Sequence, residues 1–80
     1  MITGVQIRCA RAALKWSLEM LAQKSSVSDR TIKRFEQSED VPPSRSSTLM
    51  DVKRALEAAG IEFIGAPDNA PGIRIHKRTP

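Results

Sequence analysis

Positions 25–39, SSVSDRTIKRFEQSE, hold a concentration of charged side chains. Arg30, Lys33 and Arg34 recur at steps of three and four residues, so a helix would gather them on one face. A guanidinium group donates hydrogen bonds in a fixed fork that matches phosphate oxygens and the edge of guanine, and the carboxylate of Asp29 can accept from the amino group of cytosine. The stretch therefore carries side chains that suit contact with nucleic acid.

The apolar residues of the same stretch form only a narrow edge. Val27, Ile32 and Phe35 lie at helical spacing, and Ser28 is a good N-terminal cap for a helix that we expect to run to about Gln37. Such a helix can dock on a core by its thin apolar edge and leave its charged face free. The pattern alone leaves two interpretations open, a face that binds a partner and a face that is simply solvated.

Composition bounds the class of protein. The chain has 80 residues, of which 40% are hydrophobic, so we expect one small domain whose core needs further support. Cys9 is the only cysteine and His76 the only histidine, which excludes an intrachain disulfide and a Cys/His zinc site and leaves oligomerisation as the support. The net charge of +4 suits a polyanionic partner. Because no long apolar run is present, we expect neither a signal peptide nor a membrane span, and a cytoplasmic location.

No constellation for catalysis is recognisable. Nucleophilic catalysis needs a base beside the nucleophile, and His76 lies close to the C-terminus. Glu39 and Asp40 are adjacent and lack the spacing of metal ligands, and the sequence contains no glycine-rich phosphate loop. We therefore expect no enzyme, no metal and no cofactor.

Two helices are predicted before the charged stretch. Thr3 can cap the first, which should run to about Leu14, and Ser17 can cap the second, over residues 18–24. With the helix over residues 28–37 and a fourth helix further on, they form inward stripes of apolar residues. The residues expected to face the core are Ile7, Ala10, Leu14, Leu18, Leu21, Ala22, Ile32, Phe35, Leu49, Val52, Leu56 and Ala59.

A loop and the fourth helix follow the charged stretch. Pro42–Pro43 cannot continue a helix, so the segment around them should be irregular. Ser46 or Ser47 can cap the fourth helix, and Gly60 is well placed to end it.

Beyond Gly60 the hydrophobic pattern changes its period. IEFI at 61–64 and GIRI at 72–75 alternate apolar and polar residues, as half-buried strands do, and the turn-rich GAPDNAP lies between them. The two strands either form a β-hairpin or pair across a dimer, and residues 76–80 form a basic tail. The apolar side chains assigned to a dimer interface are Ile61, Phe63, Ile73 and Ile75, and the fourth helix stays open as the other possible contact.

Three segments together resemble a known family. They are QIRCARAALKWS, LEMLAQKSSVSDRTIKRFE and VPPSRSSTLMDVKRALEAAGIEFI, which cover most of residues 5–64. The combination is similar to the Cro/CI-like (Xre) helix-turn-helix transcriptional regulators of small bacterial and phage type. The resemblance implies a mainly α fold, with a four-helix lambda-repressor-like helix-turn-helix domain over residues 1–60. Residues 61–80 would add a C-terminal β-hairpin or strand pair for dimerisation, and the helix over 28–37 would read DNA.

The resemblance also implies roles for single residues. Base edges would be read by Asp29, Arg30, Lys33 and Arg34. DNA phosphates would be contacted by Ser17, Ser28, Thr31, Ser44, Arg45 and Ser46. The positions that match a buried salt bridge of phage-repressor relatives are Arg11 and Glu36.

Three positions depart from the family's pattern. Leu18 stands where the second helix usually begins with a glutamine that touches the DNA backbone, and it lacks the polar group for that contact. Ser26 and Lys15 stand where the family usually has glycine. Because a left-handed backbone is costly for residues with a Cβ atom, we expect strain or an altered turn at these two positions.

The function that follows is a sequence-specific DNA-binding transcriptional regulator, acting as a homodimer on an inverted repeat with half-sites ~10 bp apart. The expected partners are double-stranded DNA and a second copy of the chain, with RNA polymerase as a further candidate. No membrane and no small-molecule ligand are expected. The alternative is a protein-binding module on the same fold, an antitoxin or antiactivator that sequesters a protein partner. Repression and activation both remain open.

Overall fold

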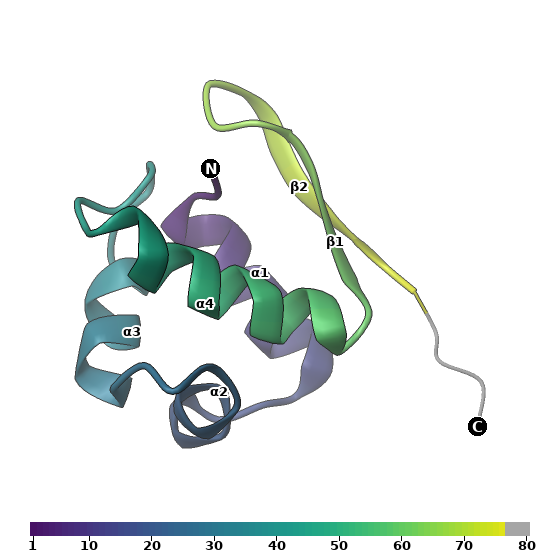
Figure 1. The fold of residues 1–80 in the computed structure, drawn as a ribbon. Coiled ribbons are helices and arrows are strands. Elements are labelled where there is room, and N and C mark those ends of the chain that lie inside the picture. The colour runs from purple at the N-terminus through teal and green to yellow at the C-terminus, as the bar shows by residue number, and fades with distance from the viewer. Residues whose placement is uncertain (77–80) are drawn as a thin grey trace.

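The computed structural model describes residues 1–76, in which four helices are followed by one β-hairpin. Figure 1 shows α4 running across the middle of the molecule, with α2 and α3 on one side of it and the hairpin on the other. The predicted succession of helices and an antiparallel strand pair is confirmed, whereas the predicted basic tail lies, beyond His76, outside the described residues. The elements are α1 (Gly4–Leu14), α2 (Leu18–Ser25), α3 (Asp29–Glu36), α4 (Ser46–Ala58), β1 (Ile61–Ala66) and β2 (Asn69–Ile75).

The first three helices begin at hydroxyl side chains, as predicted. Thr3 Oγ1 accepts from the backbone N–H of Gln6 at 3.1 Å, and Gln6 Oε1 accepts from the N–H of Thr3 at 2.9 Å in return. Ser17 and Ser28 accept from backbone N–H groups at the starts of α2 and α3. Each hydroxyl satisfies one of the N–H groups that a helix start leaves without a partner.

The start of α4 corrects a prediction. Ser46 and Ser47 lie inside the helix, and the cap is Arg45, whose side chain makes no capping hydrogen bond. The carbonyl oxygen of Arg45 accepts from the backbone N–H groups of Thr48 and Leu49, so the helical ladder already begins there. A serine hydroxyl caps only from the residue before the helix, which is why neither serine serves.

Two helix ends have a left-handed backbone. Lys15 after α1 has φ 59° and ψ 33°, and Ser26 after α2 has φ 59° and ψ 27°. These are the positions where the resemblance implied glycine, so the chain adopts the left-handed conformation without it. The Cβ atom makes that conformation about 1–2 kcal/mol less favourable for each residue.

Lys15→Gly and Ser26→Gly should therefore each stabilise the domain. Glycine adopts this backbone without steric penalty, and we expect the free energy of unfolding to rise by about 0.5–1 kcal/mol despite glycine's greater freedom in the unfolded chain. Urea titration followed by circular dichroism measures the change. Lys53→Gly, inside α4, is the matched control and should lower the free energy of unfolding by about 1 kcal/mol. Equal destabilisation by all three substitutions would contradict the explanation.

The core receives apolar side chains from every helix, from the N-terminal segment and from β1. Ile2, before α1, and Ile61, at the start of β1, are as deeply buried as the helical residues. All positions predicted to face inward from the helices are buried or half-buried. The buried apolar residues are Ile2, Ile7, Ala10, Leu21, Val27, Ile32, Phe35, Leu49, Val52, Leu56 and Ile61.

β1 and β2 pair antiparallel within one chain, which decides between the two predicted arrangements in favour of a hairpin. Ile61 lies opposite Ile75, and Phe63 lies opposite Ile73. Because directly opposed residues share a face and alternate residues return to it, these four side chains belong to one face of the hairpin.

That face corrects part of the predicted dimer interface. Ile61 belongs to the core of its own domain, with 3% of its surface exposed, and Phe63 and Ile73 are half-buried against the same core. Ile75 alone among the four is largely exposed, at 56%. The alternating pattern located the apolar face of the strands correctly, but that face covers the helices of the same chain.

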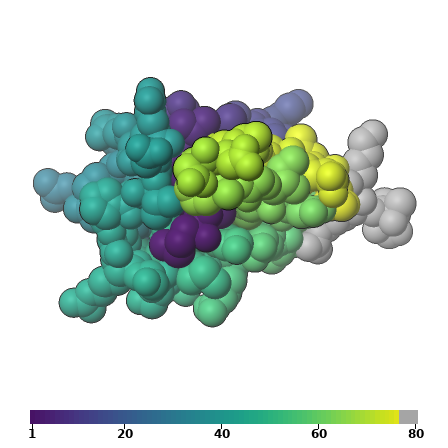
Figure 2. Space-filling model, turned by 90° about the horizontal axis from the view of Figure 1, so that it is seen from above, coloured from purple at the N-terminus to yellow at the C-terminus, as the bar shows by residue number. Residues whose placement is uncertain are grey.

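The strands run further into the turn-rich segment than predicted. A register shift after Ile64 accompanies Gly65 at φ 76°, and the strands reach a turn at residues 67–68. The buried side chain of Gln6 donates from Nε2 to the carbonyl oxygens of Ile64 at 3.2 Å and Gly72 at 2.8 Å. This contact fastens the hairpin to the start of α1. In Figure 2 the hairpin (yellow-green) lies across the face that is turned to the viewer, with purple residues from the N-terminal part of the chain visible on both sides of it.

Gly4→Ala should destabilise the domain strongly. A Cβ atom at position 4 would lie 2.1 Å from the carbonyl oxygens of both Phe35 and Ser38, so α1 would have to move away from the end of α3. We expect the free energy of unfolding to fall by about 2–3 kcal/mol in urea titration. Gly72→Ala is the control, because its Cβ would meet only side-chain atoms of Ile64, at 3.5 Å and 3.7 Å. A similar loss in both variants would rule out the steric explanation.

Candidate nucleic-acid interface

α3 contacts its own domain by one face only. Ile32 and Phe35 are fully buried and Glu36 is nearly so, while the other side chains of α3 are exposed or half-buried. Only three residues separate α3 from α2. In Figure 1 α2 is viewed nearly along its axis and α3 from the side, so the two helices cross and do not run alongside each other.

A cationic surface lies on the exposed side of α3. The structure brings Arg30, Lys33 and Arg34 together with Thr31 and Gln37 around one shallow hollow. The three basic side chains are exposed, and no ion pair joins any of them to another residue in the described part of the chain. Positive charge that the fold itself does not neutralise suits an anionic partner. We call these five residues the α3 cationic surface.

Gln37 was not predicted to belong to this surface. It is the C-terminal cap of α3, four residues after Lys33 and three after Arg34, which is the spacing of neighbours on one helix face. The spacing in the sequence therefore already places Gln37 on this helix face, but the basic residues alone do not indicate that an uncharged neighbour belongs to it. Its amide group both donates and accepts hydrogen bonds, whereas its basic neighbours only donate.

Asp29 lies apart from this group. It is exposed in the first turn of α3 and does not line the hollow. A carboxylate near a helix N-terminus interacts favourably with the positive end of the helix dipole. The position of Asp29 is therefore favourable for the helix itself, and the base-reading role of this residue stays a prediction.

The residues predicted to contact phosphate gather at the starts of helices. Ser17 and Ser28 cap α2 and α3, and each hydroxyl accepts a hydrogen bond from a backbone N–H of its own helix. The start of α4 holds Ser44, Arg45 and Ser46, all of them exposed. Helix N-termini carry N–H groups without helical partners and the positive end of the dipole, both of which favour an anion.

Arg11 of α1 and Glu36 of α3 form the ion pair that the resemblance implied. Arg11 Nε donates to Glu36 Oε2 at 2.7 Å and Arg11 Nη2 donates to Glu36 Oε1 at 2.8 Å, a two-pronged contact. The side chains are 23% and 8% exposed. The hydrogen bond to the Glu36 carboxylate raises the pKa of Arg11, against the opposing effect of partial burial.

Two arginines of α1 hold the end of α3. Arg11 Nη1 also donates to the carbonyl oxygen of Trp16 at 3.0 Å, and Arg8 Nη1 donates to the carbonyl oxygen of Glu36 at 2.9 Å. The guanidinium of Arg11 therefore binds both α3 and the connection between α1 and α2. These contacts fix the position of the α3 cationic surface relative to the rest of the domain.

Arg11→Met should lower the free energy of unfolding by about 3 kcal/mol, because it leaves the Glu36 carboxylate buried without a partner. The double variant Arg11→Met/Glu36→Leu should recover part of this loss, since no unpaired charge remains in it. Urea titration of the wild type, of Arg11→Met, of Glu36→Leu and of the double variant gives the coupling energy between the two side chains. Losses that simply add in the double variant would show that the two side chains act independently.

A second group of titratable side chains lies on the opposite face of the hairpin from Ile61. Glu62 Oε1 accepts a hydrogen bond from Arg74 Nη1 at 3.3 Å, and the same oxygen lies 2.6 Å from His76 Nε2. The hydrogen bond to His76 lowers the pKa of Glu62, and the positive charge of Arg74 acts in the same direction.

Residues 1–76 contain no group of three or more His, Cys, Asp or Glu side chains that could hold a metal ion. None of the helices described is both long enough and apolar enough to span a bilayer.

Comparisons with protein-family models, with curated proteins and with solved structures found no match to this chain. The family resemblance of its motifs stays a prediction. What the chain does is therefore inferred from the α3 cationic surface and from the contacts that hold α3 in place.

Proposed function

We propose that the chain is a sequence-specific, double-stranded DNA-binding transcriptional regulator whose helix-turn-helix consists of α2 and α3. The observation that carries the proposal is the α3 cationic surface. Arg30, Lys33 and Arg34 are exposed without an ion pair to any described residue, on a helix whose opposite side is buried. An α-helix fits the major groove of B-DNA, and a helix held from one side presents its other side to base edges.

In this proposal the exposed polar side chains of α3, and Gln37 after it, each have a chemically matched partner on a base. Arg30 and Arg34 pair with O6 and N7 of guanine, and Lys33 contacts guanine or phosphate at the edge of the surface. The amide of Gln37 matches N6 and N7 of adenine. Asp29 accepts from N4 of cytosine but repels nearby phosphate, so it contributes more to specificity than to affinity.

Phosphate contacts supply the sequence-independent part of the affinity. They are assigned to Ser17, to Ser28 and Thr31, and to the segment Ser44–Ser46, where helix N-termini and the charge of Arg45 favour an anion. Leu18 makes no polar contact at the start of α2.

The regulator is proposed to act in the cytoplasm as a homodimer, on an inverted repeat with half-sites ~10 bp apart. One module of this size binds DNA weakly, and linking two modules raises the effective concentration of the second. Because Ile61 is part of the core, the exposed Ile75 is the hairpin residue assigned to contact between copies. Occupancy of a promoter would then block RNA polymerase or recruit it.

Selection of binding sites from a randomised double-stranded DNA pool, at two salt concentrations, tests the proposal. We expect a two-fold symmetric site to be enriched and its affinity to fall steeply with salt, because phosphate contacts release counterions. Arg30→Ala and Arg34→Ala should each weaken binding to that site about 5- to 100-fold and relax the preference for one base pair. Arg54→Ala removes the same charge from the exposed face of α4 and should change the affinity much less.

Two results would overturn the proposal. One is a pool in which no sequence is enriched, and the other is an equal loss of affinity in all three Arg→Ala variants. In the first case the α3 cationic surface would be assigned to a protein partner, as in the antitoxin or antiactivator alternative. Affinity capture with the wild-type chain and with Arg30→Ala as bait would then identify the partner.

A further inference from the structure

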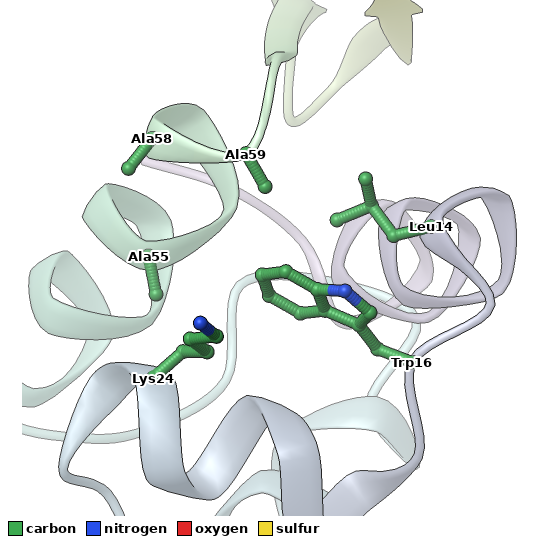
Figure 3. A pocket seen from close by; sticks show the side chains of 6 residues that line it. All are labelled: Leu14, Trp16, Lys24, Ala55, Ala58 and Ala59. Atoms are coloured by element: carbon green, nitrogen blue, oxygen red, sulfur yellow. The ribbon is translucent and has the colours of Figure 1, made fainter. Parts of the chain in front are cut away.

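A hollow of about 360 Å³ opens where α1 ends, between α2 and α4. Figure 3 shows the indole of Trp16 between Leu14 of α1 and Lys24 of α2, with the three alanines at the end of α4 on the other side. We call it the Trp16 hollow. It is lined by Leu14, Trp16, Lys24, Ala55, Ala58 and Ala59.

The space exists because α4 presents only methyl groups along this side. Ala55, Ala58 and Ala59 recur at three- and four-residue steps, so the end of α4 contributes only methyl groups to the lining of the hollow. Trp16 is half-buried and packs against the core, and part of its ring borders the hollow. The volume falls in the range of small-molecule sites, which are lined mainly by apolar and aromatic groups with few polar ones.

One charged group borders the hollow. Lys24 lies in the last turn of α2, and in Figure 3 its side chain rises toward the indole. Over residues 1–76 no acidic side chain forms an ion pair with Lys24. An ammonium group beside an aromatic and apolar surface complements a molecule with an apolar body and one negative charge.

We propose that the Trp16 hollow binds a small aromatic carboxylate, with its ring against the indole and the alanine methyl groups and its carboxylate on Lys24. A neutral aromatic molecule would leave the ammonium group unmatched, and an aromatic cation would be repelled by it. An inorganic anion would gain nothing from the apolar lining. This inference revises the expectation, drawn from the sequence alone, that the chain has no small-molecule ligand.

The hollow is connected to α3 through hydrogen bonds. The carbonyl oxygen of Trp16 accepts from Arg11 Nη1 at 3.0 Å, and the same guanidinium binds Glu36 of α3 at 2.7 Å. Lys24 lies two residues before Ser26, the left-handed residue between α2 and α3. A ligand that moves Trp16 or Lys24 therefore acts on the segments that position α3. Its role as an effector of DNA binding rests on the proposed function, whereas the binding itself does not.

Titration of the full chain with sodium benzoate, followed by NMR without DNA, tests the binding. Trp16 is the only tryptophan, so its indole N–H gives a single signal that reports on the hollow. We expect saturable shifts of this signal and of the Lys24 and Ala58 backbone signals at low millimolar benzoate, roughly what a ligand of so few atoms supports. Benzyl alcohol should bind about three- to fivefold more weakly, and benzylamine should give no saturable shift.

Two pairs of variants locate the site. Ala58→Leu should abolish the saturable shift because leucine fills the hollow, whereas Ala12→Leu places the same side chain at an exposed position of α1 outside it and should bind as the wild type. Lys24→Met should weaken benzoate about three- to fivefold and leave benzyl alcohol unchanged. Lys24→Arg keeps the charge and should retain the wild-type affinity. Ala58 and Lys24 are exposed, so all these chains should fold.

Three results would overturn the proposal. The first is an indole signal that does not saturate with benzoate, and the second is an equal response to benzoate, benzyl alcohol and benzylamine. The third is an indole signal that shifts with protein concentration alone, with a matching rise in sedimentation mass, which would assign the hollow to contact between copies. Benzoate binding without selective DNA binding would remove only the effector role. Selective DNA binding without benzoate binding would remove only the ligand.

Discussion

The carboxylate of Glu36 is nearly buried at the end of α3, where an unmatched charge would destabilise the fold by several kcal/mol. Arg11 matches that charge with two hydrogen bonds, and Arg8 binds the adjacent carbonyl oxygen. A helix of eight residues is not stable in isolation, so the direction of α3 depends on such outside contacts. Ser28 fixes one end, the two arginines fix the other, and buried Ile32 and Phe35 anchor the turns between them. The outer side of α3 therefore stands in a defined position without taking part in the packing of the fold.

The hairpin has a comparable dependence on a buried polar group. Gln6 completes the capping box of α1 and also binds two carbonyl oxygens of the hairpin, so one side chain starts a helix and holds a sheet. Ile61 adds an apolar side chain to the core beside α4. This contribution matters because a chain of 80 residues has only a small core. The hairpin thus stabilises the helices that carry α3, in addition to any contact that it makes with a second copy. Apolar strand residues in so small a domain belong first to its own core.

Local signals were sufficient to predict the helices, since caps and apolar periodicity act within a few residues. Ile2 was missed because a single apolar residue before a helix has no periodic neighbours. The contacts of Gln6 with the hairpin were missed because those partners lie 58 and 66 positions away. Alternation in the strands predicted a covered face, but alternation cannot say which chain covers it. In the candidate site, the charges of α3 were predicted and Gln37 was not. The Trp16 hollow is space left between three helices, and no residue pattern encodes such a space directly.

One charge of α3, that of Arg30, is not placed for the benefit of the helix. Asp29 near its start and Lys33 and Arg34 in its last turn suit the helix dipole, but Arg30 lies in the first turn, at the positive end. Arg30 also stands three and four residues before Lys33 and Arg34, where like charges each destabilise a helix by about 0.2–0.5 kcal/mol. No ion pair in the described part of the chain offsets this repulsion. Arg30 is therefore placed where it locally opposes the formation of α3, as side chains at functional sites often are, and a polyanion in contact with the α3 cationic surface would remove its repulsion from Lys33 and Arg34.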